Sequence, residues 1–283
     1  MINYSVTLNP QTKFIFSTSG SESSIEKHNN AFKKLGLNLV YFTFPHNITP
    51  QEYAGLLRSP IAQGAAVTGR GGLKSSIIPF LDVVEPLALK TLAVNTIVNN
   101  EGKLFGYNSD AIGLKTALVK GIEASGLDVK TAVIYGNGGV SGVAFQVLLE
   151  LGIKVTLAGR NPEKVQEKKK QLGIEHYSHF EGPYDLVVDA TPISSQTDFI
   201  DSIGFRNLLE SCKMVFCHNM PEKDNKINYM EQYCAEKNIF FIPGKWMYNA
   251  QLLKQYRLLF EGFNKPNGSP ISEQDIVETW AID

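Results

Sequence analysis

The order of hydrophobic and polar positions along the chain follows two alternating patterns. Short runs of apolar and β-branched residues, typical of strands, are separated by longer stretches whose apolar positions recur with the period of a helix. The clearest case is the middle of the chain. An apolar run at residues 131–135 is followed by a stretch whose apolar residues share one helical face, and then by a second apolar run at 154–158. Because strands of this kind alternate with helices, the pattern predicts an α/β fold with a doubly wound parallel sheet.

The ends of several helices can be predicted from single residues. Ser23 and Glu26 fit a capping box, which would open a helix that stops near Gly36. A helix capped by Asn161, with proline at its first position, should follow the strand at 154–158. Further elements are expected as strands at 14–16, 39–44, 185–188, 214–217 and 239–242, a hairpin of strands 94–98 and 104–107 with its turn at 99–102, and helices at 110–124 and 246–262.

Length and composition narrow the class of protein. At 283 residues, the chain is near the size at which one hydrophobic core splits into two, and we expect a domain boundary within or just before the helix at 110–124. A net charge of -1 without long runs of one sign argues against a nucleic-acid partner. No apolar run is long enough for a membrane span, and the start has no signal-peptide pattern. The three cysteines lack a CxxC pair, so we expect buried thiols and no metal.

A glycine-rich turn lies where a dinucleotide site would need it. Gly136, Gly138 and Gly139, with Asn137 between them, follow the strand at 131–135 and open the next helix. Glycines there let the backbone approach a pyrophosphate, and the helix N-terminus offers free N–H groups. The alternative is a tight turn without a ligand, but the strand before and the helix and strand after favour the binding site.

The end of the next strand predicts which dinucleotide is bound. A site for NAD needs a carboxylate there for the ribose 2′-hydroxyl, and the segment Thr156-Leu157-Ala158-Gly159-Arg160 has none. Arg160 and Lys164, assisted by Asn161, can instead bind a 2′-phosphate. NADP is therefore favoured over NAD, the alternative being that the two cations are solvated surface charges.

Five segments resemble, in order, the motifs of the shikimate dehydrogenase family. Two of them look like the family's AVNT and GYNTD motifs at a fitting mutual spacing. The five segments are Ala93-Val94-Asn95-Thr96, Gly106-Tyr107-Asn108-Ser109-Asp110, Gly136-Asn137-Gly138-Gly139, Gly159-Arg160-Asn161 and Met247-Tyr248-Asn249-Ala250-Gln251. The segment His28-Asn29-Asn30-Ala31-Phe32 also matches, and the similarity covers nearly the whole chain.

The resemblance implies a substrate-binding α/β domain at residues 1–110, with 245–283 packing back on it, and a Rossmann-type NADP-binding domain at 111–244. The activity that it implies is reversible NADP-dependent oxidoreduction of shikimate, a cyclic polyol carboxylate, on the route to chorismate and the aromatic amino acids. It also implies a cytoplasmic monomer or homodimer.

The resemblance further implies roles for single residues. Lys74 and Asp110 match the catalytic pair. The positions that match substrate-binding residues are Ser17, Ser19, Thr68, Asn95 and Gln251. The positions assigned to the cofactor are Gly136, Asn137, Gly138, Gly139, Arg160, Asn161, Lys164, Thr191 and Gly244.

The chemistry of these side chains agrees with the implied reaction. A lysine ammonium can stabilise the alkoxide that forms from a ring ketone and donate the proton, and a carboxylate can orient it. Each residue also has a plainer interpretation: Lys74 can be a solvated residue, Asp110 a first-turn acid, and Asn95 a residue that satisfies the hairpin backbone. Ser17, Ser19 and Thr68 can be strand-end hydroxyls, and Gln251 a surface helix residue.

The chain also departs from the family pattern in four places. Ala66-Val67-Thr68 stands for Asn-Val-Thr, and the loop from Gly69 to Lys74, which holds Arg70, is two residues longer. The second departure is an insertion after Ser19. The third is the segment that begins Asp189-Ala190-Thr191, which replaces the family's Asn-Ala-Thr-x-x-Gly-Met and lacks its Gly-Met. The fourth is His218-Asn219-Met220-Pro221, which lacks the family's tyrosine. These changes leave three alternatives open: a related substrate such as quinate, a non-catalytic NADP or metabolite sensor, and another Rossmann enzyme such as a methylenetetrahydrofolate dehydrogenase.

Overall fold

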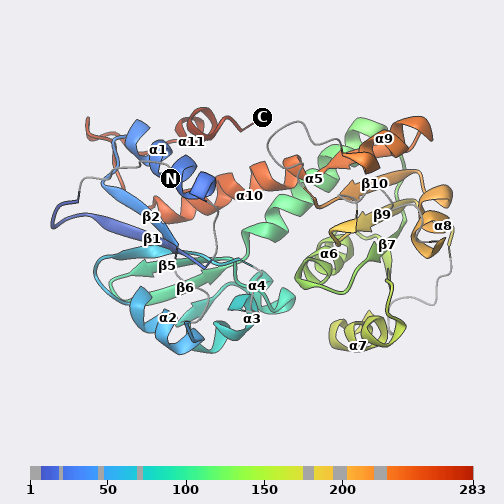
Figure 1. The fold of residues 1–283 in the computed structure, drawn as a ribbon, viewed down its shortest axis with the longest axis horizontal. Coiled ribbons are helices and arrows are strands. Elements are labelled where there is room, and N and C mark those ends of the chain that lie inside the picture. The colour runs from blue at the N-terminus through green and yellow to red at the C-terminus, as the bar shows by residue number, and fades with distance from the viewer. Residues whose placement is uncertain are drawn as a thin grey trace. The chain divides into compact units, whose positions relative to one another are not determined.

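The computed structural model divides the chain into two compact units, one formed by Met1–Ser109 with Leu252–Asp283 and the other by Asp110–Gln251. It describes residues 8–18, 22–43, 48–68, 73–174, 182–193, 203–219 and 228–282 (Figure 1). Four of the predictions lie outside these residues: the role of Ser19, the loop at 69–72 with Arg70, the Gly-Met position at Ser194-Ser195, and the end of the 218–221 segment.

The first unit is built on a six-stranded mixed sheet. Its strand order is β2-β1-β3-β5-β6-β4, in which β1 is parallel to both of its neighbours and β5 is antiparallel to β3 and β6. The strands are β1 (Lys13–Ser17), β2 (Leu39–Thr43), β3 (Ala62–Ala66), β4 (Val83–Val84), β5 (Thr96–Asn100) and β6 (Lys103–Tyr107). The two strands predicted near the start of the chain are thus neighbours.

Helices surround this sheet. They are α1 (Glu22–Lys34), α2 (Pro50–Leu57), α3 (Leu73–Ser76), α4 (Pro86–Thr91), α11 (Glu273–Trp280) and, between α3 and β4, the 3-10 turn η2 (Ile78–Phe80). The capping box predicted at Ser23 is wrong, because α1 already includes Glu22 and an N-cap residue lies outside its helix. A capping box does open α2, where Thr49 and Glu52 cap each other.

The predicted hairpin is confirmed, but its turn is shorter than expected. Asn99 and Asn100 belong to β5, and Asn100 is paired with Lys103. Only Glu101 and Gly102 form the loop, with φ of 51° and 84°. Two positive φ values in succession are those of the type I′ turn that suits the twist of a two-residue hairpin.

Buried aromatic rings pack the end of the chain against α1 within the first unit. Tyr256, Phe260 and Trp280 lie against His28 or Phe32, with ring centroids 5.6 to 6.4 Å apart. The Tyr256 hydroxyl lies 2.6 Å from His28 Nδ1, and Trp280 Nε1 donates to the same nitrogen at 3.2 Å. The prediction that His28 is a packing residue agrees with this position.

The second unit is a five-stranded, fully parallel sheet of order β11-β10-β9-β7-β8. The strands are β7 (Thr131–Tyr135), β8 (Lys154–Ala158), β9 (Leu186–Asp189), β10 (Met214–Cys217) and β11 (Phe240–Pro243). The helices are α5 (Ser109–Ser125), α6 (Gly139–Glu150), α7 (Pro162–Leu172), α8 (Ile203–Ser211), α9 (Tyr229–Glu236) and α10 (Gly244–Leu259), the last continuing into the first unit. The predicted α/β fold with a doubly wound parallel sheet is confirmed.

Local signals in this unit correspond to the observed helix ends. Asn161 caps α7 by accepting from the backbone N–H of Lys164 at 3.0 Å, and the helix ends at Gly173 with φ of 68°. Strands β9 and β11 start one residue later than predicted. No helix among the described residues is both long and apolar enough to cross a membrane.

Candidate active site

The glycine turn predicted to bind a dinucleotide lies directly after β7. Gly136 has φ of 122°, where a side chain would be strained, and a Cβ built on it would lie 2.6 Å from Thr191 Cγ2. Gly138 is the N-cap of α6, whose N-terminus carries no side-chain cap, and a Cβ on Gly138 or Gly139 would meet nothing within 4 Å. The space beside these glycines and the helix N-terminus without a side-chain cap fit the pyrophosphate of a dinucleotide.

A hollow beside this turn has room for the adenosine end of such a ligand. A cavity of about 400 Å³ lies at the end of β8, and its lining residues are Tyr135, Ala158, Gly159, Arg160, Gly204 and Leu208. Arg160 lines this cavity and is exposed, and Lys164 in the first turn of α7 is also exposed. An exposed guanidinium beside the cavity suits a solvent-facing phosphate. Asn161, expected to assist, uses its side-chain oxygen to cap α7.

The segment after β9 packs on the glycine turn and also contacts the segment after β10. Thr191 hydrogen-bonds through its backbone N and its hydroxyl to Asp189 Oδ1, at 3.0 and 2.6 Å. Asn219 Nδ2 donates to the Thr191 carbonyl at 2.9 Å. A Cβ built on Gly244 would lie within 2.9 Å of three backbone oxygens of residues 217–219, so only glycine fits there. The segments after β9 and β10 and the start of α10 therefore meet at the carboxyl edge of the sheet.

In the first unit, several of the predicted substrate residues lie together at one edge of the sheet. Ser17 ends β1 and is fully buried. Thr18, which follows it, hydrogen-bonds through Oγ1 to the hydroxyl and to the backbone N–H of Thr68, at 3.1 and 3.0 Å. The Lys74 carbonyl accepts from Val94 N at 2.8 Å, which places the half-buried Lys74 in α3 next to the segment leading to Asn95.

Asn95 is the centre of a buried polar network. Its Oδ1 accepts from the backbone N of Ser109 at 2.8 Å and from the Thr96 hydroxyl at 3.0 Å, while its Nδ2 donates to Ser109 Oγ at 2.9 Å. Gln255 Nε2, from the far end of the chain, donates to Thr96 Oγ1 at 3.0 Å. These contacts attach β5 and the last long helix to the first residue of α5.

Sequence reasoning missed three residues of these networks. Ser109 stands inside the motif that was used for Asp110, and Gln255 lies one helical turn after Gln251, so only their neighbours were considered. Thr18 sits between the two serines of the expected pair. All three could have been found by considering the polar residues that lie beside a predicted site residue or one helical turn from it.

Asp110 and Gln251 belong to the second unit. Asp110 is buried, with 6% of its surface exposed, and lies in the first turn of α5 directly after Ser109. Gln251 is half-buried on α10, and a Cβ added to Gly113 would lie 2.9 Å from its Cβ, so α5 and α10 pack closely at this point.

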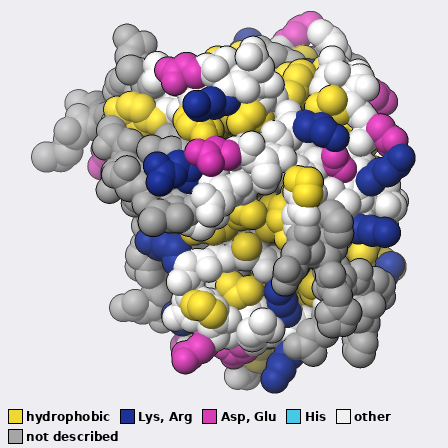
Figure 2. All heavy atoms as spheres, turned by 90° about the vertical axis from the view of Figure 1, so that its right-hand side faces the viewer, with side chains coloured by type: hydrophobic (Ala, Val, Ile, Leu, Met, Phe, Trp, Pro, Cys, Tyr) yellow, Lys and Arg dark blue, Asp and Glu magenta, His cyan; other side chains and the backbone are white. Residues whose placement is uncertain are grey.

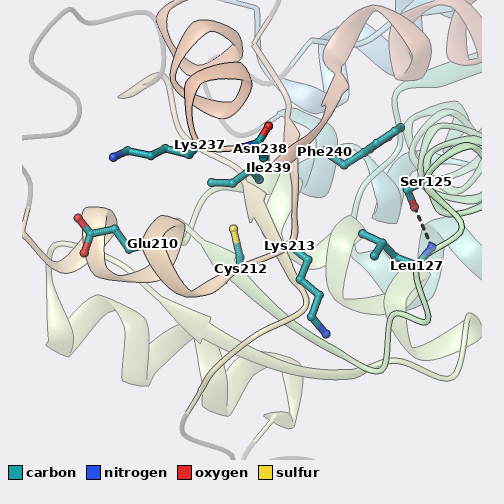
Figure 3. A pocket seen from close by; sticks show the side chains of 9 residues that line it. All are labelled: Ser125, Leu127, Glu210, Cys212, Lys213, Lys237, Asn238, Ile239 and Phe240. Carbon is teal, nitrogen blue, oxygen red and sulfur yellow. Dashed lines mark hydrogen bonds between the residues drawn. The ribbon is translucent and has the colours of Figure 1, made fainter.

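Another cavity in the second unit lies away from these residues, at the amino ends of β10 and β11. It has a volume of about 540 Å³ and is lined by Lys213, Lys237 and Glu210 among others (Figure 3). Cys212 in its wall is buried, and burial raises the pKa of this thiol to about 12, so it is a poor nucleophile. In parallel α/β sheets ligands bind at the carboxyl ends of strands, which favours the glycine turn as the site.

Charged side chains of both signs lie on the same face of the described surface. On the face shown in Figure 2, basic and acidic side chains are interspersed with apolar ones. This distribution agrees with the net charge of -1 and with a small-molecule ligand.

Comparisons with known proteins find similarity to shikimate dehydrogenases. Residues 19–97 match the family model described as the shikimate dehydrogenase substrate binding domain. A shikimate dehydrogenase (NADP(+)) of Bacillus cereus is 30% identical over 190 residues, which are 62% of this chain and 66% of that protein. The match thus spans just under two thirds of this curated relative.

Solved structures extend the similarity to nearly the whole chain. A shikimate 5-dehydrogenase-like protein superposes with a TM-score of 0.73 at 24% identity, covering 98% of this chain and 99% of the other. A shikimate dehydrogenase in complex with NADP+ gives a TM-score of 0.70 at 25% identity, with 98% of each chain covered. The chain is therefore similar to shikimate dehydrogenases in the matched substrate-binding segment and in its two-unit fold.

Proposed function

We propose that the protein is an NADP-dependent dehydrogenase that reversibly oxidises shikimate or a close cyclic hydroxy acid. The observation that carries this proposal is the open glycine turn after β7, with the exposed Arg160 lining the adjoining cavity. The named relatives are NADP-dependent shikimate dehydrogenases, and the segment after β8 has no carboxylate to favour NAD.

The cofactor is expected to bind along the carboxyl edge of the parallel sheet. Backbone N–H groups at Gly138 and Gly139 would hold its pyrophosphate, and Arg160 with Lys164 its 2′-phosphate. NADP, when bound, supplies or accepts the hydride. Thr191 and Gly244 would line the site of the nicotinamide ring, because both are closely packed at that edge of the sheet.

The polar residues of the first unit are assigned to the substrate. Hydroxyl and amide groups both donate and accept hydrogen bonds, which suits a polyol acid, so Ser17, Ser19 and Thr68 are proposed to bind its carboxylate or hydroxyls. Asn95 and Gln251 are proposed to contact ring hydroxyls. Asn95 also hydrogen-bonds to Ser109 through its amide oxygen and its amide nitrogen, which fixes the orientation of its side chain.

Lys74 is proposed as the general acid and base, with Asp110 as its partner. When a ring ketone is reduced, the lysine ammonium hydrogen-bonds to the developing alkoxide and gives it a proton. In the reverse direction the neutral amine accepts the proton from the substrate hydroxyl. The Asp110 carboxylate would orient the ammonium and accept from a neighbouring hydroxyl of the substrate.

A second candidate is a different substrate of the same class, such as quinate. Ala66 stands at the buried end of β3 where the family motif has asparagine, so one amide available to a ring hydroxyl is lost. A substrate that differs at one ring position would fit this change.

The test is an assay of NADP+ reduction against a panel of cyclic hydroxy acids that includes shikimate and quinate. We expect NADPH to form with shikimate or with a close analogue. If NADPH and shikimate bind tightly but no member of the panel is oxidised, the protein is a sensor on this scaffold and the enzyme proposal is wrong. Activity on a folate alone would instead support the methylenetetrahydrofolate dehydrogenase alternative.

A further inference from the structure

Asp189 occupies a central position at the carboxyl edge of the parallel sheet. It is the last residue of β9 and has no exposed surface. It is paired in register with Tyr135 of β7 on one side and with Cys217 of β10 on the other. The residues that follow these partners are Gly136 of the glycine turn and His218, so Asp189 lies between the two segments expected to shape the cofactor site.

The Asp189 side chain is directed at the loop that follows its own strand. Oδ1 accepts from the backbone N–H of Thr191 at 3.0 Å and from the Thr191 hydroxyl at 2.6 Å. The same hydroxyl oxygen then accepts from Ile193 N at 3.2 Å, and Asn219 Nδ2 donates to the Thr191 carbonyl at 2.9 Å. Thr191 is thus held at its amide, its hydroxyl and its carbonyl, and two of these three bonds depend on one carboxylate oxygen.

This position of Thr191 matters because the loop packs directly on the glycine turn. A Cβ built on Gly136 would lie 2.6 Å from Thr191 Cγ2 and 3.1 Å from the Ala190 carbonyl oxygen. The Ala190 amide donates to the Tyr135 carbonyl at 2.9 Å, just before that turn. A movement of the Thr191 loop would therefore displace the backbone that is expected to hold the pyrophosphate.

We propose that Asp189 is a positioning residue for the cofactor: through its two hydrogen bonds to Thr191, it sets the loop on which the glycine turn rests and thereby the affinity for NADP. This inference rests on the proposed NADP-binding function. It assigns a role to a buried carboxylate at a position where the family motif has asparagine. The role needs an acceptor oxygen at this position, which aspartate and asparagine both provide.

The experiment compares Asp189→Ala and Asp189→Asn with the wild-type protein. Asp189→Ala removes the acceptor of both bonds, so we expect the Kd of NADP+ to rise roughly tenfold, the effect of losing a charge-assisted hydrogen bond. Asp189→Asn keeps an acceptor oxygen and should bind NADP+ within about threefold of wild type. In turnover assays, the KM for NADP+ should rise in Asp189→Ala while the KM for the organic substrate stays unchanged.

Asp185→Asn is the matched control. Asp185 immediately precedes the same strand, at the end opposite to Asp189, and accepts from the backbone of Lys130 and Thr131 and from Lys213. Its replacement should lower stability without changing the Kd of NADP+. A purely structural role for Asp189 would make Asp189→Ala behave in the same way.

Hydrogen exchange of the cofactor-free protein provides a readout that does not depend on NADP. The Thr191 amide should exchange faster in Asp189→Ala than in wild type or in Asp189→Asn. An unchanged Thr191 exchange rate, or an unchanged Kd in Asp189→Ala, overturns the inference while the proposed function stands. If the wild-type protein itself does not bind NADP+, the proposed function and this inference both fail.

Discussion

Asn95 and Ser109 hold each other in place at the start of α5. The Ser109 amide donates to Asn95 Oδ1 at 2.8 Å, and Asn95 Nδ2 donates back to Ser109 Oγ at 2.9 Å. Both residues are almost fully buried, so each bond satisfies a group that has no access to water. The pair fixes the first turn of the helix that begins with Ser109 and Asp110.

The first prediction is that Ser109→Ala is destabilising. It removes the acceptor of the Asn95 amide, and a buried donor left without a partner costs about 1 to 3 kcal/mol of unfolding free energy. Urea unfolding measures this loss. Ser109→Thr, which restores the residue of the family motif, keeps the hydroxyl and is the control. Equal stability of Ser109→Ala and wild type would show that the bond contributes little.

The second prediction concerns Lys74. Lys74→Ala should lower turnover by about 10²- to 10⁴-fold, the usual contribution of a general acid or base, while KM changes far less. Steady-state kinetics with the preferred substrate of the panel measures both constants. Lys90→Ala, at an exposed lysine of α4 in the same unit, should leave both unchanged. Full turnover of Lys74→Ala would remove Lys74 from the mechanism.

The third prediction tests the choice of cofactor. Arg160→Ala should raise the KM for NADP+ by roughly 10- to 100-fold, because hydrogen bonds to charged groups contribute more than neutral ones. The KM for NAD+ should stay the same, since NAD+ has no 2′-phosphate. Lys154→Ala, at the other end of β8, removes a cation far from the cavity and is the control. A parallel loss for both cofactors would contradict this role of Arg160.

The fourth prediction concerns the space in front of α6. Gly138 has an extended backbone, and a Cβ there would meet nothing within 4 Å, so Gly138→Ala should fold normally. The methyl group would stand where the pyrophosphate is expected, at a cost of about 1 kcal/mol or roughly fivefold in the Kd of NADP+. Gly55→Ala, in α2 and equally unobstructed, is the control. Unchanged binding by Gly138→Ala would place the cofactor elsewhere.

The fifth prediction follows from the protonation of His28. Burial lowers its pKa from 6.5 to about 3, with Lys27 adding to the shift. Below pH 6.5 the unfolded chain binds a proton that the folded protein does not, so stability is highest above pH 6.5 and falls with acidification. We expect a loss of about 2 kcal/mol between pH 6.5 and 5, measured by urea unfolding.

The variant His28→Gln isolates this contribution. It should show a much smaller loss over the same pH range. Carboxylates with lowered pKa values do not interfere, because Asp185 and Asp275 have pKa values of about 2 and their stabilising effect is lost only at lower pH. A steep loss that persists in His28→Gln would assign the pH dependence to another group.

The sequence by itself determined the parallel sheet of the second unit and the position of the glycine turn. The residues 131–135, 154–158 and 214–217 are strands as predicted, and Asn161 and Gly173 mark the ends of α7. These features could be predicted because apolar periodicity, caps and glycines with positive φ act over a few neighbouring residues. The differences from the predictions, such as the Ser23 cap, the length of the hairpin turn and the starts of β9 and β11, are shifts at the ends of elements.

Only the tertiary structure decided which polar side chains meet. Asn95 and Ser109 are 14 positions apart, Thr18 and Thr68 are 50 apart, and Gln255 reaches Thr96 across 159 positions. No local pattern encodes such contacts, because they depend on how the strands are ordered in the sheet and where α10 packs. The same reason applies to Asp189, whose neighbours Tyr135 and Cys217 become adjacent only when β7, β9 and β10 pair.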